Sequence, residues 1–556
     1  MFKILLVNPP ISVYAPKAAI IPLPSLTLGG ILRDLRTKGL EITFELVDLD
    51  LLLKLGQLED AVEFYDKAVT LIFEKNPDAC FFSTHGANMP ITIQLCQKIK
   101  ERTSNILTVL GGVAPTLSGR QLIEHFDAID MIIKGEAEPS LPEWVKQALG
   151  NRLFHKVPSA VLRYKGAIID NPRLRLKDGN GFVFPDYSLI DMEVYRKHNE
   201  RCPFIFPGLA LVESGRGCNF NCTFCAPAKM WESRVLYKPI DKIIEEMSFL
   251  KDRGFDFTYF TQDNLDAEFM RQLASELVRR QVHFRWGAYA RINQMDDELV
   301  DLLARSGCKL LFVGLETPNR GQQKYVRKFL DKSQMLQRIR ALNAKGIRLI
   351  CSFIAAFEGE TEEEFENTLE FAVECAVSEE FPTLKKKLGA KTFESLPEKP
   401  INYSTVHPLS DMPGTDFDEE VKGRLRLVAY TNHHDAYGST LFGLDTFTGQ
   451  NWKYVLNTFV THLTEEQVSF YYPRLRLFNI LCVHAFHLAY FLTTQEISIL
   501  QFLHRLIAHI GEEAILTTNV QEFEKILSDA ISRMMGSQLA PDAARKLSKP
   551  MLRNLG

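Results

Sequence analysis

Long apolar runs, blocks of like charge and cysteines are all scarce in this 556-residue sequence. The longest apolar window covers residues 478–492, which is too short for a membrane span and contains His484 and His487. The formal charge of -4 is spread over 65 basic and 69 acidic residues, which leaves no electrostatic footprint for nucleic acid. We therefore expect a globular protein with no membrane span and no nucleic-acid partner, in which residues 478–492 form a buried C-terminal helix.

An export signal is also missing from the N-terminus. The apolar run in "MFKILLVNPP" is stopped by Asn8, Pro9 and Pro10 before it reaches the length of a secretory signal. We expect a cytoplasmic protein with reduced cysteines. Seven of the ten cysteines are scattered, and we interpret them as small buried hydrophobic residues. They are Cys80, Cys96, Cys202, Cys308, Cys351, Cys375 and Cys482.

The first 150 residues alternate apolar, strand-like runs with amphipathic, helix-like segments. Strands that are apolar throughout and separated by helices indicate a parallel sheet covered on both faces. The sequence therefore predicts an α/β, doubly wound domain over residues 1–150, with its ligand at the carboxyl ends of the strands. The residues at those ends are Asn8, Pro9, Ser83, Thr84, His85, Gly111, Gly112, Gly135 and Glu136.

Small residues at these strand ends let a backbone approach a large, flat or tailed ligand, although turns also need glycine. The G-x-G-x-x-G pattern of a dinucleotide site is absent. The stretches "LLVNPP", "VLGGVAPT" and "MIIKGEAEPS" resemble the cobalamin-binding domain that precedes the catalytic domain in many radical S-adenosylmethionine (SAM) enzymes. The resemblance implies that these loops hold the corrin ring and its nucleotide tail.

The loop after the first strand departs from one version of that domain. Cobalamin domains that ligate cobalt from below use Asp-x-His-x-x-Gly there, whereas this sequence reads "NPPISVYAP". The resemblance thus implies a cofactor whose own base is displaced and that receives no histidine from this motif. His85 lies in another loop at the same edge, either as a cobalt ligand or as an ordinary hydrogen-bonding residue.

The other three cysteines fall within eight residues, in "ESGRGCNFNCTFCAP". Cys218, Cys222 and Cys225 have the spacing C-x3-C-x2-C, and no second pair lies at a distance suited to a four-ligand zinc site. Three thiolates suit a [4Fe-4S] cluster whose fourth iron binds an exogenous ligand. Free buried cysteines and a partial zinc knuckle are the alternatives. Gly215 and Gly217 would let the loop wrap closely around a cluster.

This pattern, with the aromatic Phe224 before the last cysteine, resembles the radical SAM superfamily, and the resemblance implies that Phe224 contacts SAM. In that family the open iron chelates SAM, and an electron from the cluster cleaves it to methionine and a 5'-deoxyadenosyl radical. The neighbouring charges of Arg216 and Lys229 are interpreted as solvated. From residue 206 to 417, six strand-helix units follow one another, which predicts a (βα)6 partial barrel with its site at the carboxyl ends of the strands.

The strand ends of this barrel match the family's SAM-binding positions. In "FTQDN" the resemblance points to Gln262 and Asp263 for the methionine amine, in "ARIN" to Arg291 for a carboxylate, and in "VGLET" to Glu316 for the ribose or the amine. Taken singly, Asp263 and Glu316 could instead be strand-end carboxylates that cap the following helix. The turn in "AAFEGE" lacks the family's usual Gly and Pro, and "TQDN" is not the commonest form of that segment.

Residues 151–205 are expected to form an ordered connector with a hairpin near Gly166, and residues 418–556 a helical C-terminal domain that shapes the substrate site. His433, His434 and Asp435, like the two histidines in the window 478–492, lack a third ligand at fixed spacing. We interpret them as polar or core positions.

The resemblance as a whole implies a cobalamin-dependent radical SAM enzyme that uses SAM, cobalamin and a [4Fe-4S] cluster. A C-methyltransferase acting on an unactivated carbon is the activity it most often implies. A low-potential donor such as flavodoxin or ferredoxin would supply the electron, and a small molecule or peptide would be the substrate. The alternatives are a cobalamin radical enzyme that oxidises, cyclises or rearranges without methylating, and a non-catalytic cobalamin or iron-sulfur sensor.

Overall fold

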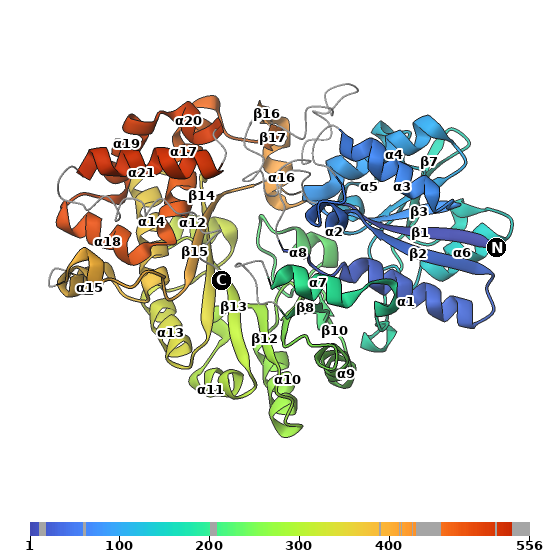
Figure 1. Ribbon diagram of the computed structural model, residues 1–556, viewed down its shortest axis with the longest axis horizontal. Helices are drawn as coiled ribbons and strands as arrows, with labels where there is room; N and C mark the ends of the chain where they lie inside the picture. The colour runs from blue at the N-terminus through green and yellow to red at the C-terminus, as the bar shows by residue number, and fades with distance from the viewer. Residues whose placement is uncertain are drawn as a thin grey trace.

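The computed structural model describes residues 1–10, 18–58, 63–200, 208–388, 391–410, 412, 414–424, 426–429, 458–517 and 520–535. Figure 1 shows the N-terminal sheet domain at one end, the barrel in the middle and a group of C-terminal helices at the other end. His433, His434, Asp435 and Cys202 lie outside the described residues.

The N-terminal domain is built on one seven-stranded sheet of order β2-β1-β3-β4-β5-β6-β7. Its first five strands are mutually parallel. They are β1 (Phe2–Asn8), β2 (Ile42–Asp48), β3 (Ala79–Ser83), β4 (Leu107–Gly111) and β5 (Met131–Ile133). This confirms the doubly wound domain, with the strand order 2-1-3-4-5 that such folds use.

Alternate residues of β1 enter two different cores, because successive side chains of a strand point to opposite faces. Ile4 and Leu6 pack in the core with α1 (Leu23–Thr37) and α6 (Leu141–Leu149). Leu5 and Val7 pack in the other core. That second core also receives α3 (Phe64–Glu74), α4 (Met89–Arg102) and α5 (Val113–His125). Both faces of the sheet are therefore covered.

The sheet continues beyond residue 150 into the connector. The strands β6 (Ala160–Tyr164) and β7 (Ala167–Asp170) form an antiparallel hairpin, and β6 also pairs antiparallel with β5. Lys165 and Gly166 turn the hairpin with φ of 50° and 79°. The expected hairpin is present, but it belongs to the sheet of the N-terminal domain rather than to a separate linker.

The second domain is a six-stranded, all-parallel sheet of order β15-β14-β13-β12-β11-β8. Its strands are β8 (Leu209–Val212), β11 (Phe257–Phe260), β12 (Arg285–Ala290), β13 (Cys308–Glu316), β14 (Arg348–Ala355) and β15 (Tyr403–Pro408). The helices between them are α9 (Ile240–Lys251), α10 (Ala267–Arg279), α11 (Asp297–Arg305), α12 (Arg320–Val326), α13 (Lys332–Ala344), α14 (Glu362–Val377) and α15 (Phe381–Leu388). The strand-helix alternation confirms the expected (βα)6 partial barrel.

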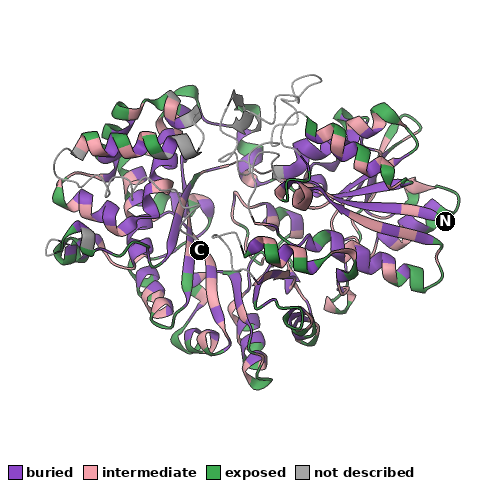
Figure 2. Cartoon of the chain, viewed as in Figure 1, coloured by how far each residue is buried: buried purple, intermediate pink, exposed green. Residues whose placement is uncertain are grey.

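One face of the barrel sheet is packed by helices, and the other is more open. Trp286 and Ala288 of β12 are buried in the main core, whereas Tyr289 between buried neighbours keeps 39% of its surface exposed. Figure 2 shows this mixture of buried and intermediate residues along the barrel strands. The open face is the one turned away from the covering helices.

The C-terminal helices close the far edge of the barrel. They are α17 (Glu465–Cys482), α18 (Ala485–Thr494), α19 (Ile499–Ile510), α20 (Glu512–Thr517) and α21 (Val520–Met535). Asn479 of α17 donates to Val406 O and accepts from Val406 N, both at 2.9 Å, so that it satisfies the unpaired edge of β15. His487 is buried against Phe393 with ring centroids 4.6 Å apart, as expected of a core position.

Residues 478–492 divide between α17 and α18, which are bent by 109° at their junction, instead of forming the single helix expected. No single helix of the described residues is long and apolar enough to cross a membrane, although this bent pair passes the same test of length and composition. Of the seven scattered cysteines, the six within the described residues are buried, as expected.

A buried ion pair attaches the connector to the barrel. Lys238 forms an ion pair with Glu246 of α9, and the two side chains are 2% and 0% exposed. Tyr187 of the connector donates its hydroxyl to the same carboxylate at 2.7 Å. Glu246 is thus held by two partners from different parts of the chain.

We expect Glu246→Leu to destabilise the protein by about 3–5 kcal/mol, because it leaves the Lys238 ammonium buried without its counter-charge. The first unfolding transition of a thermal or urea melt measures this loss. The double variant Lys238→Met/Glu246→Leu is the control and should recover much of the lost stability, since it removes both charges. A single variant that melts with the native protein would contradict the argument.

Candidate cluster and cofactor site

The three clustered cysteines lie in the loop that follows β8. Cys225 is the N-cap residue of α8 (Ala226–Trp231), and its N–H donates to Cys222 O at 3.2 Å. All three side chains are partly exposed rather than buried. Desolvation of the Cys225 thiol, which keeps only part of its surface exposed, raises its pKa to about 12.

Close backbone contacts fix the conformation of the cysteine loop. The short strand β9 (Gly215–Arg216) pairs antiparallel with β10 (Leu236–Tyr237). Gly217 has φ of 92°, and a Cβ at this position would lie 2.0 Å from Arg234 O. No side chain fits there, so glycine is required immediately before Cys218. The expected close wrapping of the loop is present.

Three of the predicted SAM-binding residues gather around this loop. Asp263 accepts the Gly217 N–H at 3.1 Å, and burial raises its pKa to about 6. Gln262 accepts from Ser214 Oγ at 3.4 Å, while its buried Nε2 has no hydrogen-bond partner among the described residues. Arg291 donates to Cys222 Sγ at 3.1 Å and lies over the Phe220 ring at 3.4 Å. The Nε2 group of Gln262 is therefore a donor available to a ligand.

The other two predicted SAM-binding residues have protein partners. Glu316 ends β13 with φ of 60°, and its carboxylate pairs with Lys328 Nζ at 2.8 Å, both side chains being about 9% exposed. Phe224 packs against the small apolar cluster that contains Val326 and Phe417. No sequence motif marks Lys328, which is brought to the strand end only by the fold. The roles of Phe224 and Glu316 toward SAM stay predictions.

A helix after the last barrel strand braces the cluster loop from outside. In α16 (Asp416–Val421), Phe417 N donates to Thr223 O at 3.1 Å. Asp416 pairs with Lys229 at 2.5 Å and with Arg327 at 2.7 Å. Lys229 remains 45% exposed, consistent with a solvated charge that also has an ion-pair partner. The sequence offered no signal for this brace, because Asp416 and Phe417 are far along the chain from Lys229, Thr223 and Arg327.

The predicted cobalamin edge is formed by the carboxyl ends of β1, β3 and β4 with the described residues that follow them. Thr84 N donates to Gly111 O at 2.8 Å, and a Cβ on Gly112 would lie 2.1 Å from Thr84 O. His85 is exposed at this edge. Asn8 is tied to Asp48 of the neighbouring strand, its Nδ2 donating at 2.8 Å. The edge thus presents backbone and small side chains, which fits a flat ligand lying across it.

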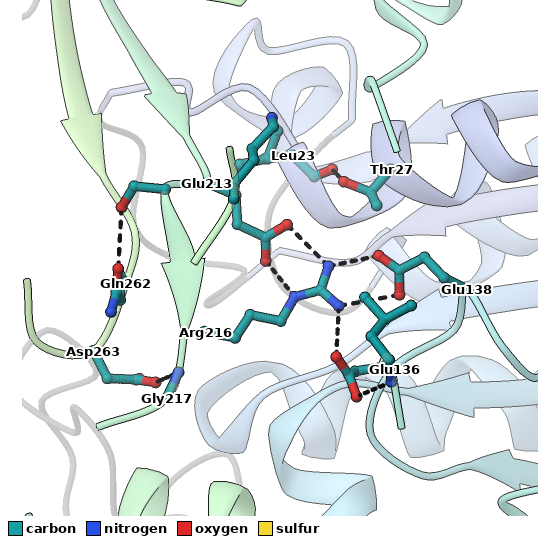
Figure 3. A network of polar contacts seen from close by, with 12 residues as sticks. Leu23, Thr27, Glu136, Glu138, Glu213, Arg216, Gly217, Gln262 and Asp263 are labelled. Atoms are coloured by element: carbon teal, nitrogen blue, oxygen red, sulfur yellow. Dashed lines mark hydrogen bonds and ion pairs between the residues drawn. The ribbon is translucent and has the colours of Figure 1, made fainter. Parts of the chain in front are cut away.

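The loop after β5 faces the barrel. Glu136 Oε1 lies 3.4 Å from Arg216 Nη1 (Figure 3). Glu136 Oε2 accepts the Leu176 N–H at 3.0 Å. Both carboxylate oxygens therefore have protein partners, and the assignment of Glu136 to cobalamin stays a prediction that these contacts do not support. Arg216 is only 11% exposed, so its interpretation as a solvated charge was wrong.

The donor set suits a cluster better than a single ion. Among the described residues, no group of three or more His, Cys, Asp or Glu side chains is placed to hold one metal ion. A [4Fe-4S] cluster differs from a site for one metal ion, because it needs one thiolate on each of three irons. The loop supplies three partly exposed thiols, which is the number that a cluster with one open iron needs.

Two protein-family models match the sequence. Residues 31–145 match the B12 binding domain, and residues 212–372 match the Radical SAM superfamily. The chain carries a radical SAM domain and a B12-binding domain. This confirms the family that the motifs resemble, the enzyme class, and the three cofactors: SAM, a [4Fe-4S] cluster and cobalamin.

Similar sequences carry both methyltransferase and cyclase names. An uncharacterized methyltransferase of Pyrococcus horikoshii is 24% identical over 321 residues, 57% of this chain and 68% of that protein. The anaerobic magnesium-protoporphyrin IX monomethyl ester cyclase of Rubrivivax gelatinosus is 26% identical over 50% of each chain. The hopanoid C-3 methylase of Methylococcus capsulatus is 23% identical over 50% of this chain and 53% of that protein. This radical SAM chain thus spans about half the length of the last two.

Two solved structures share the fold. The methyltransferase TsrM of Kitasatospora setae, with cobalamin and a [4Fe-4S] cluster bound, has a TM-score of 0.55 at 18% identity and covers 77% of each chain. The cobalamin-dependent SAM radical enzyme OxsB, with aqua-cobalamin and SAM bound, has a TM-score of 0.61 at 14% identity and covers 99% of this chain and 78% of its own. The fold of this radical SAM protein therefore extends over the C-terminal helices as well.

We expect Cys222→Ala to prevent assembly of the cluster, because two thiolates cannot hold three of its irons. Iron and sulfide analysis after anaerobic reconstitution, with the visible absorption of the cluster, measures the loss. Cys96→Ala changes a buried cysteine of the other domain and should leave the iron content unchanged. Equal iron in the two variants would contradict the assignment of the three cysteines.

We expect Gly217→Ala to disrupt the loop by more than the cost of its positive φ, because the new Cβ would collide with the Arg234 carbonyl. Gly254→Ala is the matched control. Its φ is 82°, but the nearest atom to its Cβ is in the flexible Arg196 side chain at 3.5 Å, so only strain of about 1 kcal/mol is expected. Similar melting temperatures and iron contents for the two variants would show that the loop is not so constrained.

Proposed function

We propose that this protein is a cobalamin-dependent radical SAM C-methyltransferase that acts on an unactivated carbon. The observation that carries the proposal is the direct contact between the two cofactor-binding regions. The loop with the three cysteines and the loop after β5 of the B12-binding domain share the ion pairs of Arg216, so the carboxyl ends of both parallel sheets meet (Figure 3).

When bound, the cluster with SAM would supply a 5'-deoxyadenosyl radical that removes a hydrogen atom from the substrate, and cobalamin would supply a methyl group. The chain's own task is to hold the two cofactors and exclude water. Cys218, Cys222 and Cys225 would hold the cluster. Gln262 Nε2, a buried donor with no partner among the described residues, would bind a polar group of SAM beside it.

The substrate would lie against the open face of the barrel. Three aromatic rings from adjacent strands line this face. The Tyr259 and Tyr289 rings are 5.2 Å apart, and the Tyr289 and Phe312 rings are 5.0 Å apart. The main-chain carbonyl of Tyr289 accepts the Leu265 N–H, two residues after Asp263, which places this wall next to the cluster loop. Such a surface suits an apolar or aromatic substrate group.

The second candidate is a cobalamin radical enzyme that does not methylate. It is favoured by the cyclase named above, which is as similar to this chain as the methyltransferases are. A sensor function is less well supported, since a sensor needs neither an open iron nor an open barrel face. A low-potential donor of the flavodoxin or ferredoxin type would reduce the cluster, and a reducing cytoplasm agrees with the six buried, unpaired cysteines.

The test uses holoprotein reconstituted anaerobically with iron, sulfide and cobalamin, methyl-labelled SAM and a low-potential reductant. Chromatography follows 5'-deoxyadenosine, S-adenosylhomocysteine and the label on cobalamin, with the Cys222→Ala variant as control. We expect 5'-deoxyadenosine that depends on the cluster, together with labelled methylcobalamin. Deoxyadenosine without label on cobalt would favour the non-methylating enzyme, and the absence of both products would contradict either reaction.

A further inference from the structure

Arg216 is the centre of a polar network that joins the two cofactor domains (Figure 3). Its guanidinium donates to both oxygens of Glu138, at 2.7 and 3.0 Å, and lies 3.4 Å from Glu136. Within its own loop it donates to both oxygens of Glu213, at 2.6 and 2.9 Å. Glu136 and Glu138 belong to the B12-binding domain, and Arg216 precedes the first cluster cysteine by two residues. All five N–H groups of the side chain are directed at carboxylates.

The network is buried, and its charges do not balance internally. The side chains of Glu136, Glu138 and Arg216 are 4%, 6% and 11% exposed. Three carboxylates therefore share one guanidinium. Its Cζ atom also lies 4.6 Å from the centroid of the Phe182 ring. Without this cation the carboxylates of the two domains would repel each other in a medium of low dielectric constant. The attachment of the domains at this point depends on Arg216.

The backbone around Arg216 makes the attachment stiff. Gly217 is fixed by its contact with Arg234 O and by the hydrogen bond to Asp263. On the other side, a Cβ on Gly215 would lie 2.7 Å from both Leu236 O and Gln262 Oε1. A displacement of the guanidinium would therefore move the segment that begins the cluster loop. The B12-binding domain thereby contacts the segment before Cys218 through the Arg216 side chain, in addition to the packing of α5 against α8.

We propose that Arg216 is a positioning residue that fixes the distance between the cobalamin edge and the cluster, and thereby couples SAM cleavage to methyl transfer. The claim that Arg216 couples SAM cleavage to methyl transfer rests on the proposed function. The claim that Arg216 fixes the distance between the cobalamin edge and the cluster does not. The geometry requires a guanidinium specifically. A lysine ammonium has no planar fork and cannot pair with two carboxylates bidentately at once.

The experiment compares holoproteins that contain the cluster and cobalamin. The variants are Arg216→Lys and Glu138→Gln. The matched control is Arg280→Lys, since Arg280 also pairs with two carboxylates, those of Asp241 and Glu276, but at an exposed site within the barrel domain. Iron and cobalamin contents are measured first, to select preparations that are loaded equally.

The first readout is the magnetic dipolar interaction between the reduced cluster and cob(II)alamin, recorded by electron paramagnetic resonance, because this interaction falls with the cube of the distance. We expect a weaker or broader interaction in Arg216→Lys, a smaller change in Glu138→Gln, and none in the control. An interaction in both variants equal to that of the native protein would overturn the positioning role.

The second readout supplies 3-phenylpropionate as a probe methyl acceptor, because its aromatic ring suits the wall of Tyr259, Tyr289 and Phe312. It measures the amount of 5'-deoxyadenosine formed per methyl group that passes from prelabelled cobalamin to this acceptor. We expect this ratio to rise about tenfold in Arg216→Lys, because a displacement of the reacting groups by an ångström strongly reduces their productive approach. An unchanged ratio would overturn the coupling. If the native protein transfers no methyl group to this acceptor, the coupling part fails together with the proposed transfer to an aromatic substrate, but the first readout still decides the positioning role. If Arg216→Lys does not fold, Glu138→Gln decides both readouts.

Discussion

Two cofactors can act on one substrate atom only if the regions that hold them stay at a fixed separation, and here one buried cation joins those regions at their strand ends. The guanidinium of Arg216 binds carboxylates of both domains, and the glycines on either side of it leave the loop no room to shift. The strand ends of the B12-binding domain and the cysteine loop each form from their own segment of the chain. Charged contacts then hold the two regions next to each other.

The rest of the chain supports the same loop from the other side. The brace from α16 contacts the loop through Thr223 and Lys229, and Asn479 of α17 fastens the helical region to the last barrel strand. Glu360, in the turn after β14, accepts hydrogen bonds from Ala356 N–H, from Gln322 and from Tyr471 of α17. Burial raises the pKa of Glu360 to about 7. The C-terminal helices are therefore integral to the barrel.

Local signals in the sequence were sufficient for the architecture. Apolar runs alternating with helical patterns indicated both parallel sheets, and the spacing of Cys218, Cys222 and Cys225 indicated a loop for a cluster. These features depend on neighbours in sequence. The contacts of Arg216 with Glu138 and of Asp416 with Lys229 do not, since each partner comes from a distant segment. Lys328 is only 12 residues from Glu316, but no motif marks it, and an isolated charge resembles any solvated one. For the same reason the hairpin near Gly166 was expected, but its pairing with β5 was not.

The central claim is that cobalamin and the cluster face each other across the junction held by Arg216. An anaerobic crystal structure of the holoprotein with SAM tests this most directly. We expect the corrin to lie between the strand ends near Gly112 and the open barrel face. The cluster should be bound by the three cysteines and by SAM, and Arg216 should retain its contacts to Glu136 and Glu138. A cluster with a fourth protein ligand, or cobalamin bound away from the barrel, would contradict the account.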